Sequence, residues 1–464
     1  MRGRTPAGAD STGRTPMVRR YGAGSVGCTP STLLLLASAA VAASAHTHNV
    51  VRYGADSTGR TPSTQAIAAA LSALAQAGGG SLYFPPGHYV SSPFNLTSNT
   101  VLLLDFATLA APASMANFSL VPALPSYGEG RDKLPNDLHG RFQPFIGIYH
   151  ASNVSITTNS SGTLLGRGET WWAPKRQGTL NNTPPHLIEA GWSSGVRVGA
   201  PQGSPLNALL LIDSPFWNIH LYDCDDAHVH DVTILADPEE GNNDGVDPDS
   251  SRNVLIERVQ YVGGDDGVAV KSGWDQAGID YGKPSENITV LDSTFTTRAC
   301  CVCVGSEMSG GARNIAVRNV SCVNTGTAFY VKSAPGRGGW VRNFSFTDSL
   351  LVGVDTACEI MLTYGDHPQP PLTWNASLLP VLEGFEFSRI RGSGIQTAGR
   401  LSGAPGGGVA GMTITGVRLS DVDLGSPPQG WLCTNVTGTS SSVTPPPCPQ
   451  LGAEGGGAPP FSSS

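Results

Sequence analysis

Asp265 and Asp266 form an adjacent pair of acids in the stretch YVGGDDGVAVKSGWD (261–275), directly before the apolar residues 268–270. A third acid, Asp244, stands 21 residues before Asp265 in the stretch GNNDGVDPDSS. Neighbouring carboxylates repel one another, and removing a carboxylate from water is costly unless its charge is compensated. A solvated turn would explain the Asp265–Asp266 pair on its own. A chemical role for the pair therefore depends on whether Asp244 lies beside it.

Three carboxylates on one rigid face would raise the pKa of at least one member and leave a protonated acid next to ionised bases. Glycoside hydrolysis needs this combination, and an inverting glycosidase holds its acid and base roughly 6.5–9.5 Å apart with a water behind the sugar. A Ca²⁺ ion also seeks carboxylate clusters. We expect the glycines around both acidic stretches to let a bulky ligand approach the backbone. The residues alone leave hydrolysis, calcium binding and solvated turns open.

A loose repeat supplies the elements that would position these acids. Four segments contain an asparagine, alternating apolar residues, a polar break and a second short strand: RNVLIERVQYV (252–262), ENITVLDSTFT (286–296), RNIAVRNVSCV (313–323) and RNFSFTDSLLV (342–352). Their asparagines stand 34, 27 and 29 residues apart. Self-similarity at this period indicates stacked units that bury a shared core. Short period-2 strands without intervening helices predict an all-β fold, a right-handed parallel β-helix, rather than a leucine-rich solenoid or a propeller.

Winding the chain into such coils brings the acids together. The 21 residues between Asp244 and Asp265 are close to one coil, and stacked strands lie about 4.7–4.9 Å apart. Asp244, Asp265 and Asp266 are therefore expected to converge on one outward patch. The recurring asparagines fit turns, because their amides tolerate the left-handed conformation and can form a ladder from coil to coil.

The ends of the solenoid are also predicted. Ile67, Leu71 and Leu74 recur at helical spacing ahead of Gly78, which indicates a short N-terminal capping helix. We expect a β-helix catalytic domain over 46–430. Residues 431–464 are Gly/Ser/Pro-rich and predict a tail that is disordered beyond Cys448.

Composition and leader indicate a secreted protein of the extracellular space or cell wall. The 464 residues carry a net charge of −8, which argues against nucleic acid and anionic membranes as partners. Residues 1–45 contain an apolar stretch ending in Ala43-Ser44-Ala45, which is typical of a cleaved signal peptide. The segment GADSTGRTP at 8–16 recurs identically at 54–62, which indicates a duplicated or mis-assembled N-terminus with Met17 as the start.

Sequons and cysteines agree with that compartment. Ten N-x-[ST] sequons predict a glycoprotein: Asn95, Asn117, Asn153, Asn159, Asn181, Asn287, Asn319, Asn343, Asn375 and Asn435. We expect a disulfide between Cys433 and Cys448, which bracket a Ser/Thr/Pro-rich loop. The cluster Cys300, Cys301 and Cys303 lacks a nearby second ligand pair at zinc spacing, so buried thiols or disulfide halves are expected there.

Five stretches together resemble glycoside hydrolase family 28, in its plant-type polygalacturonase-like branch. They are SPFWNIH (214–220), NNDGVDPDSS (242–251), GGDDGVAVKSGWD (263–275), VGSEMSGG (304–311) and VKSAPGRGG (331–339). The resemblance runs from about residue 49 to about residue 425. It implies a right-handed β-helix that hydrolyses pectic α-galacturonosyl bonds with inversion, without a cofactor or metal. It further implies Asp265 as the general acid, with Asp244 and Asp266 activating the attacking water.

The resemblance also suggests residues that bind substrate. Lys332 matches a lysine that pairs with a galacturonate carboxylate, although a surface lysine would look the same. Lys271 and Arg337 are further candidate cations of the cleft; Lys271 could instead neutralise the aspartates, and Arg337 could order its glycine-rich loop. His220 stands 24 residues before Asp244 and could line the cleft or be a buried histidine.

Two departures from the family pattern concern activity and specificity. Many members carry a catalytic His in a Gly-His-Gly, where this chain has Arg298-Ala299-Cys300-Cys301. Tyr330 replaces the usual Arg two residues before the binding Lys, which removes a carboxylate fork but leaves a ring that can stack on a sugar.

The sequence therefore predicts a secreted, monomeric glycosidase whose partner is a pectic polysaccharide or oligogalacturonide. An exo-polygalacturonase, or a hydrolase of rhamnogalacturonan or xylogalacturonan, fits the same residues. A pectate-lyase-like enzyme that uses Ca²⁺ and a non-catalytic wall-binding β-helix remain as alternatives.

Overall fold

The alternating apolar residues of the repeats form strands whose inward side chains stack in register from coil to coil. One such row runs Val254, Ile288, Ile315, Phe344 and Phe385, each the register partner of the next. All five side chains are buried in one core cluster that runs through the coils. Burying each of these side chains stabilises the folded state by about 1.5–3 kcal/mol relative to exposure. The repeat therefore stabilises the fold by stacking its apolar rows.

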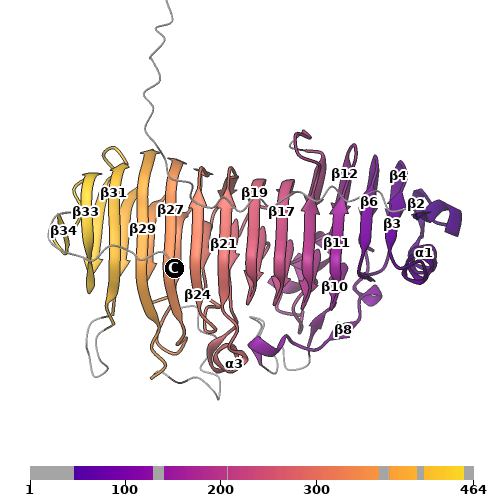
Figure 1. The fold of residues 1–464 in the computed structure, drawn as a ribbon, viewed down its shortest axis with the longest axis horizontal. Helices are drawn as coiled ribbons and strands as arrows, with labels where there is room; N and C mark the ends of the chain where they lie inside the picture. Colours follow the sequence, from indigo (N-terminus) through magenta and orange to yellow (C-terminus); the bar gives the residue numbers. More distant parts are fainter. Residues whose placement is uncertain are drawn as a thin grey trace, which may run out of the picture. The chain divides into compact units, whose positions relative to one another are not determined.

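The structure is a computed structural model that describes residues 46–128, 140–205, 207–364, 375, 377–404 and 412–453. The predicted leader, 1–45, lies outside the described residues. The described strands form a right-handed parallel β-helix, as predicted, and Figure 1 shows them stacked side by side in chain order. None of the helices among the described residues is long and apolar enough to cross a membrane.

An 11-stranded parallel sheet forms one wall of the coils. Its strands are β5 (Phe94–Leu96), β10 (Ile146–Tyr149), β13 (Ile188–Gly191), β16 (Ile219–Tyr222), β18 (Val246–Asp249), β20 (Val268–Val270), β23 (Cys300–Val304), β26 (Thr327–Lys332), β28 (Thr356–Met361), β30 (Thr397–Ser402) and β32 (Gln429–Thr434). Neighbours in this order are hydrogen-bonded, so each strand adds one coil to the stack.

The other strands of the coils form a 21-stranded parallel sheet, and β8 (Leu120–Val121) and β9 (Arg141–Phe142) form a separate antiparallel pair. The 21 strands are β1 (Thr47–Asn49), β2 (Thr58–Pro62), β3 (Gly80–Phe84), β4 (Gly87–Val90), β6 (Thr100–Leu104), β7 (Ala107–Ala110), β11 (Ser152–Thr157), β12 (Gly162–Leu165), β14 (Ser194–Gly199), β15 (Leu209–Ile212), β17 (Asp225–Leu235), β19 (Arg252–Gly263), β21 (Ser285–Leu291), β22 (Thr294–Thr297), β24 (Ala312–Arg318), β25 (Ser321–Val323), β27 (Trp340–Val352), β29 (Val381–Ser393), β31 (Ile414–Asp423), β33 (Val436–Thr444) and β34 (Leu451–Ala453). The long strand β27 pairs with both β24 and β25 of the preceding coil, because the polar break in its sequence does not interrupt the ladder.

Among the described residues, the helices are few and short. They are α1 (Thr64–Gln76), α2 (Glu169–Arg176), α3 (Asp275–Tyr281) and the 3-10 turns η1 (Val50–Tyr53), η2 (Met115–Asn117) and η3 (Pro125–Tyr127). Helix α1 lies at the N-terminal end of the stack (Figure 1) and buries Ile67, Leu71 and Leu74 against the first coils, so the predicted capping helix is confirmed. Gly79 follows it at φ +128°, where a Cβ would meet the backbone of Asn99 at 2.6 Å. Only glycine therefore fits in the turn that leads from α1 into β3.

An asparagine ladder joins the turns, as the repeat predicts. Asn253, Asn287, Asn314 and Asn343 all have φ between 55° and 57°. The side-chain amide of each later residue donates to Oδ1 of the one before it, at 3.1, 3.1 and 3.2 Å. Asparagine satisfies both needs at once, since it tolerates the left-handed conformation and carries a donor and an acceptor.

The solenoid continues beyond residue 430, where the sequence predicts the tail to begin. Strands β32, β33 and β34 add to both sheets and extend the described fold to Ala453. The tail boundary at 431 was therefore wrong, because backbone hydrogen bonds to the open edge of β31 hold even a Ser/Thr-rich strand. The predicted Cys433–Cys448 disulfide is confirmed within this segment. Residues 454–464 lie outside the described residues.

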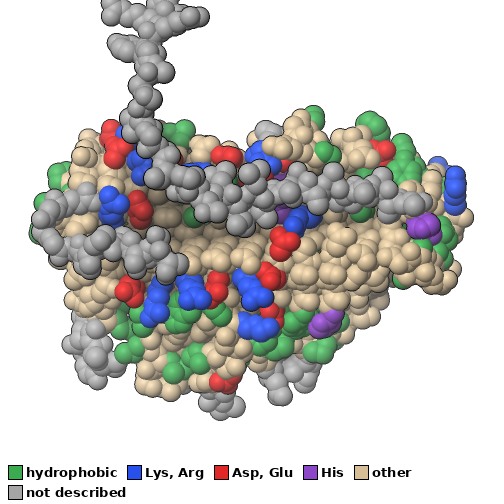
Figure 2. Space-filling view, viewed as in Figure 1, with side chains coloured by type: hydrophobic (Ala, Val, Ile, Leu, Met, Phe, Trp, Pro, Cys, Tyr) green, Lys and Arg blue, Asp and Glu red, His purple; other side chains and the backbone are tan. Residues whose placement is uncertain are grey.

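Charged side chains on the outside pair across adjacent coils. Arg252 lies 3.0 Å from Asp225, and Arg391 lies 2.8 Å from Asp421. Figure 2 shows basic and acidic side chains next to one another over much of one face. Such exposed pairs contribute at most about 1 kcal/mol each, so they adjust the surface rather than hold the coils together.

Candidate active site

Strands β18 and β20 bring the three predicted acids together. Val246 and Val268 are register partners in the 11-stranded sheet, and the N–H of Gly245 donates to the carbonyl of Asp266 at 2.9 Å. Asp244 and Asp266 therefore precede equivalent positions of neighbouring strands, one coil apart. Carboxylate oxygens of Asp244, Asp265 and Asp266 all lie within 4.8 Å of one another. The convergence expected from the coil length is present.

The three acids differ in exposure. Asp244 and Asp266 are each 2 % exposed, whereas Asp265 is half-buried at the rim. Both oxygens of Asp265 accept backbone N–H groups, Oδ1 from Asp266 at 2.9 Å and Oδ2 from Asn242 at 2.6 Å. These two bonds orient the carboxyl group of Asp265 while leaving it reachable from solvent.

Lys332 compensates the charge of Asp266. Its ammonium donates to Oδ2 of Asp266, which also accepts the thiol of Cys303 at 3.1 Å, and Oδ1 accepts the N–H of Cys300 at 3.2 Å. Burial opposes ionisation of Asp266, but the ammonium groups of Lys332 and Lys271 outweigh it and lower the pKa of Asp266 to about 2. Asp266 is therefore a fixed carboxylate at neutral pH.

Lys271 lies at the centre of a buried group of carboxyls and does not offer a cation to substrate. Its Nζ lies 3.3 Å from Asp244 Oδ2, 3.5 Å from Asp247 Oδ1 and 3.3 Å from Glu307 Oε2, and the residue is 1 % exposed. The ring of Trp217 covers the ammonium at 4.2 Å. Of the two roles considered for Lys271, neutralising the aspartates is the one the contacts fit, and its placement as a substrate-binding residue was wrong.

Asp247 and Glu307 belong to this cluster but were missed by sequence reasoning. Burial, and next the negative charge of Asp244, raise the pKa of Asp247 well above its usual range, which favours its protonated form. One ammonium among three buried carboxyls leaves excess negative charge, which a proton on Asp247 reduces. The acidic alternation in GNNDGVDPDSS was a signal for Asp247, whereas nothing in the sequence marks Glu307 as its neighbour.

Arg337 is also held inside the protein. Its Nη1 lies 2.6 Å from Oδ1 of Asp275, and its guanidinium stacks 4.1 Å from the ring of Trp274. The side chain is 1 % exposed. Arg337 therefore orders its glycine-rich loop against α3, and its placement as a cation of the cleft was wrong.

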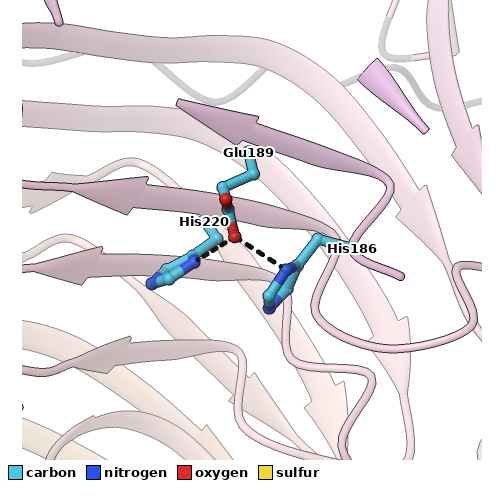
Figure 3. A group of neighbouring side chains, drawn as sticks. All are labelled: His186, Glu189 and His220. Atoms are coloured by element: carbon cyan, nitrogen blue, oxygen red, sulfur yellow. Dashed lines mark hydrogen bonds and ion pairs between the residues drawn. The ribbon is translucent and has the colours of Figure 1, made fainter. Parts of the chain in front are cut away.

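His220 is buried and does not line a cleft. It is 0 % exposed, with Nδ1 at 3.1 Å from Glu189 and Nε2 at 3.2 Å from Asp249. Figure 3 shows the imidazoles of His220 and His186 pointing at the same carboxylate oxygen of Glu189. The assignment of His220 to substrate binding was wrong, because both ring nitrogens already have acidic partners.

The His186–Glu189–His220 group has the donor set of a metal site, but its carboxylate already has several protein partners. Arg141 donates to both oxygens of Glu189 at 2.8 Å, and the hydroxyl of Tyr149 donates to one of them. Burial lowers the pKa of His186 to about 4. A guanidinium that already faces this carboxylate makes the group a structural network rather than a place for a second cation.

Tyr330 borders Lys332 on the outer side of the sheet. The ammonium of Lys332 lies 5.7 Å from the ring of Tyr330 and 5.8 Å from that of Tyr364. The two rings meet edge to face at 6.2 Å. Tyr364 was missed by sequence reasoning, since it follows β28 and reaches the site only through stacking of the coils.

The cysteines beside the acids do not form a zinc site. Cys301 is disulfide-bonded to Cys322 in the core, while Cys300 and Cys303 are buried free thiols. Burial raises the pKa of both thiols, which keeps them protonated. Lys332 already donates to the carboxylate oxygen that would complete a ligand set.

The glycines of the acidic stretches have a different role from the expected one. A Cβ on Gly245 would lie 2.5 Å from the carbonyl of Gly267, and one on Gly264 would lie 2.0 Å from the carbonyl of Glu240. These glycines make room for neighbouring protein backbone. The expectation that they admit a ligand was wrong for these positions.

A hollow of about 480 Å³ among the described residues lies away from the acids. It is lined by Trp192, Asp223, Asp225, Arg252, Lys283 and neighbouring residues of the turns that follow β13, β16 and β18. The three acids precede β18 and β20, at the opposite ends of these strands. We place the chemistry at the acids, because charge and geometry converge there and not in this hollow.

Comparison with known proteins adds the family context. Residues 137–443 match the model of glycosyl hydrolases family 28, and residues 47–173 match that of rhamnogalacturonase A/epimerase, pectate lyase-like. A probable polygalacturonase of Vitis vinifera is 33 % identical over 387 residues, which cover 83 % of this chain and 76 % of that protein.

Solved structures agree with the fold. An exopolygalacturonase from Thermotoga maritima has a TM-score of 0.72 at 25 % identity, covering 86 % of this chain and 91 % of the other. An endo-xylogalacturonan hydrolase from Aspergillus tubingensis has a TM-score of 0.60 at 18 % identity, covering 88 % and 100 %, a likeness of fold alone.

Proposed function

The chain belongs to glycosyl hydrolases family 28 and is a polygalacturonase-like glycoside hydrolase, and from this premise we propose that it cleaves α-galacturonosyl bonds of pectin with Asp265 as the general acid. The observation that carries the proposal is the convergence of Asp244, Asp265 and Asp266 within 4.8 Å. Among these three, Asp265 is the one that a glycosidic oxygen and a solvent proton can reach. An acid that solvent reaches can regain its proton between turnovers.

Asp244 and Asp266 bind and orient the attacking water in this proposal. Lys271 and Lys332 hold their carboxylates in place and compensate their charge. Both oxygens of Asp266 already accept bonds from the protein, which restrains the carboxylate from turning toward an anomeric carbon. A restrained carboxylate is a poor nucleophile but a good acceptor for water, and attack by water inverts the anomeric configuration.

Retention of the anomeric configuration is the competing outcome. Carboxyl groups lie about 5–5.5 Å apart in retaining enzymes and roughly 6.5–9.5 Å apart in inverting ones. Proton NMR of the first product formed separates the two: the β-anomer supports attack by water, and the α-anomer would require a covalent intermediate on Asp244 or Asp266.

A lyase and a non-catalytic binding protein are the remaining alternatives. A pectate-lyase-like enzyme would need Ca²⁺ and would form unsaturated products, whereas Lys271 and Lys332 already compensate the carboxylates here. Release of reducing ends without ultraviolet-absorbing products, unchanged by EDTA, supports the hydrolase. Pectin binding without any release of reducing ends would leave only the wall-binding role.

The compartment and domain limits are part of the same proposal. We propose that 1–45 is a secretory leader, that the catalytic solenoid follows it as a monomer, and that pectic polysaccharide outside the cell is the substrate. The similar proteins are named as polygalacturonases or as a xylogalacturonan hydrolase. Product profiling on a panel of pectic oligosaccharides would determine the preferred linkage and whether the action is exo or endo.

A further inference from the structure

The last five strands of the 11-stranded sheet contain few charged residues. Strands β23, β26, β28, β30 and β32 contain three charged residues, Lys332, Glu359 and Arg400. Lys271 and Arg337 are both held in buried ion pairs. Lys332 is likewise buried and paired, with Asp266, so Arg400 is the exposed cation that a polyuronate lying along these strands would meet.

Register places Arg400 in the same outward row as the site. Cys303, Tyr330, Glu359 and Arg400 are successive register partners. The row begins at the acids, because the thiol of Cys303 lies 3.1 Å from Oδ2 of Asp266 and Tyr330 packs against Cys303. With strands about 4.8 Å apart, Arg400 lies roughly 14 Å along the row from Cys303.

The guanidinium of Arg400 is oriented by neutral groups and remains partly open. Nη1 donates to Oγ1 of Thr356 at 2.9 Å, and Nη2 donates to Oγ1 of Thr397 at 3.4 Å. The side chain is 38 % exposed. A guanidinium has five N–H donors, so two hydroxyl contacts leave donors for a ligand carboxylate in a fixed orientation.

Glu359 compensates Arg400 only in part. Its Oε1 lies 3.7 Å from Nη1 of Arg400, beyond hydrogen-bonding distance. Glu359 is 5 % exposed, and burial raises the pKa of its carboxyl despite the nearby guanidinium. At 3.7 Å Glu359 does not hydrogen-bond to Arg400, which leaves donors of the guanidinium for an outside anion.

We propose that Arg400 binds the carboxylate of a second uronic acid residue of the bound chain, on the far side of Lys332 from Asp265. Arg400 then selects unesterified polyuronate at the end of the row that runs from Cys303 through Tyr330 and Glu359. This inference rests on the proposed function, since it takes the outer side of the sheet as the path of the substrate.

The test is the length dependence of KM for oligogalacturonides in Arg400→Ala. We expect KM to rise about tenfold for unesterified oligomers long enough to reach β30, as for loss of a charged hydrogen bond of about 1.5 kcal/mol, with kcat little changed. Shorter oligomers, and methyl-esterified oligomers of the same length, should show no increase. Arg400→Lys should recover part of the effect, because it keeps the charge without the fork.

Arg391→Ala is the matched control, an arginine 54 % exposed on β29 in the other sheet and paired with Asp421. An equal rise in KM at every length, or the same rise with methyl-esterified oligomers, would overturn the inference. If Arg400→Ala folds poorly, Arg400→Gln with the same substrates answers the question. If the wild-type protein releases no reducing ends, the proposed function fails, and calorimetry of oligogalacturonide binding to wild-type and Arg400→Gln still tests Arg400.

Discussion

Nζ of Lys271 lies 3.3 Å from Oδ2 of Asp244, although the two residues are 27 positions apart in the chain. Stacking of the coils creates this contact, and it couples a proposed water-binding carboxylate to an ammonium that solvent does not reach. The acids of the site therefore depend on buried cations for both their position and their charge.

Replacing Lys271 with Met should destabilise the protein strongly. The change leaves Asp244, Asp247 and Glu307 buried without their common ammonium, and breaking a buried ion cluster in this way costs about 3–5 kcal/mol. Urea unfolding at pH 7 measures the loss. Arg391→Ala, which breaks an exposed pair, should cost at most about 1 kcal/mol. Similar losses in the two variants would show that the Lys271 cluster does not stabilise the fold.

Asp247→Asn should alter how stability depends on pH. The folded pKa of Asp247 is raised above its unfolded value of about 3.9, so its contribution to stability is complete below that pH and is lost as pH rises through the folded pKa. An amide cannot ionise and removes this loss. We expect the variant to match wild-type at pH 4 and to be at least as stable at pH 8 in urea unfolding. A variant less stable at pH 8 than at pH 4, relative to wild-type, would mean that Asp247 is ionised in the folded protein.

Lys332→Met should move the acid limb of kcat to higher pH. The folded pKa of Asp266 is about 2, so Asp266 stays ionised, and its stabilising effect is lost only as pH falls through that value. Without the ammonium the pKa should rise by roughly 1–3 units, as for loss of a neighbouring opposite charge. Lys283→Met, which removes a lysine 53 % exposed and paired with Asp223, is the control. Identical pH profiles in the two variants would remove Lys332 as the partner that keeps Asp266 ionised.

Most of the fold could be predicted from the sequence, because each coil of a β-helix repeats the same pattern of residues. The asparagines of the turns and the alternating apolar residues give the coil length, and the coil length then brings Asp244 next to Asp265. Ile67, Leu71 and Leu74 likewise mark the capping helix by local spacing. These features depend on contacts within a segment or between equivalent positions of adjacent coils.

The burial and the ion-pair partners of the other polar residues could not be predicted in the same way. Lys271 meets Glu307 across 36 residues, and Arg337 meets Asp275 across 62. Because the coils differ in length, sequence spacing does not predict such partners. A buried, paired cation therefore cannot be told apart from a cation of the cleft by sequence alone. His220 was misplaced for the same reason, since its acidic neighbours come from the coils on either side.

The asparagine ladder offers a test of the fold itself. Asn314→Gly keeps the left-handed backbone at φ +57° and loses the amide bonds to Asn287 and Asn343. Asn314→Ala loses the same bonds and adds a left-handed penalty of about 1–2 kcal/mol. Chemical denaturation should therefore rank wild-type above Asn314→Gly and Asn314→Gly above Asn314→Ala. Equal stability of the two variants would mean that the turn is free to leave the left-handed conformation.

Turnover by Asp265→Asn tests the central claim most directly. The amide keeps the size of the side chain but cannot donate the proton to the leaving oxygen, so release of reducing ends should fall by at least about a hundredfold. Calorimetry should find oligogalacturonide binding nearly unchanged. Asp280→Asn, at an exposed aspartate of α3, should behave as wild-type in both measurements. Wild-type turnover in Asp265→Asn would contradict the account, because the exposed member of the trio would then not be the acid.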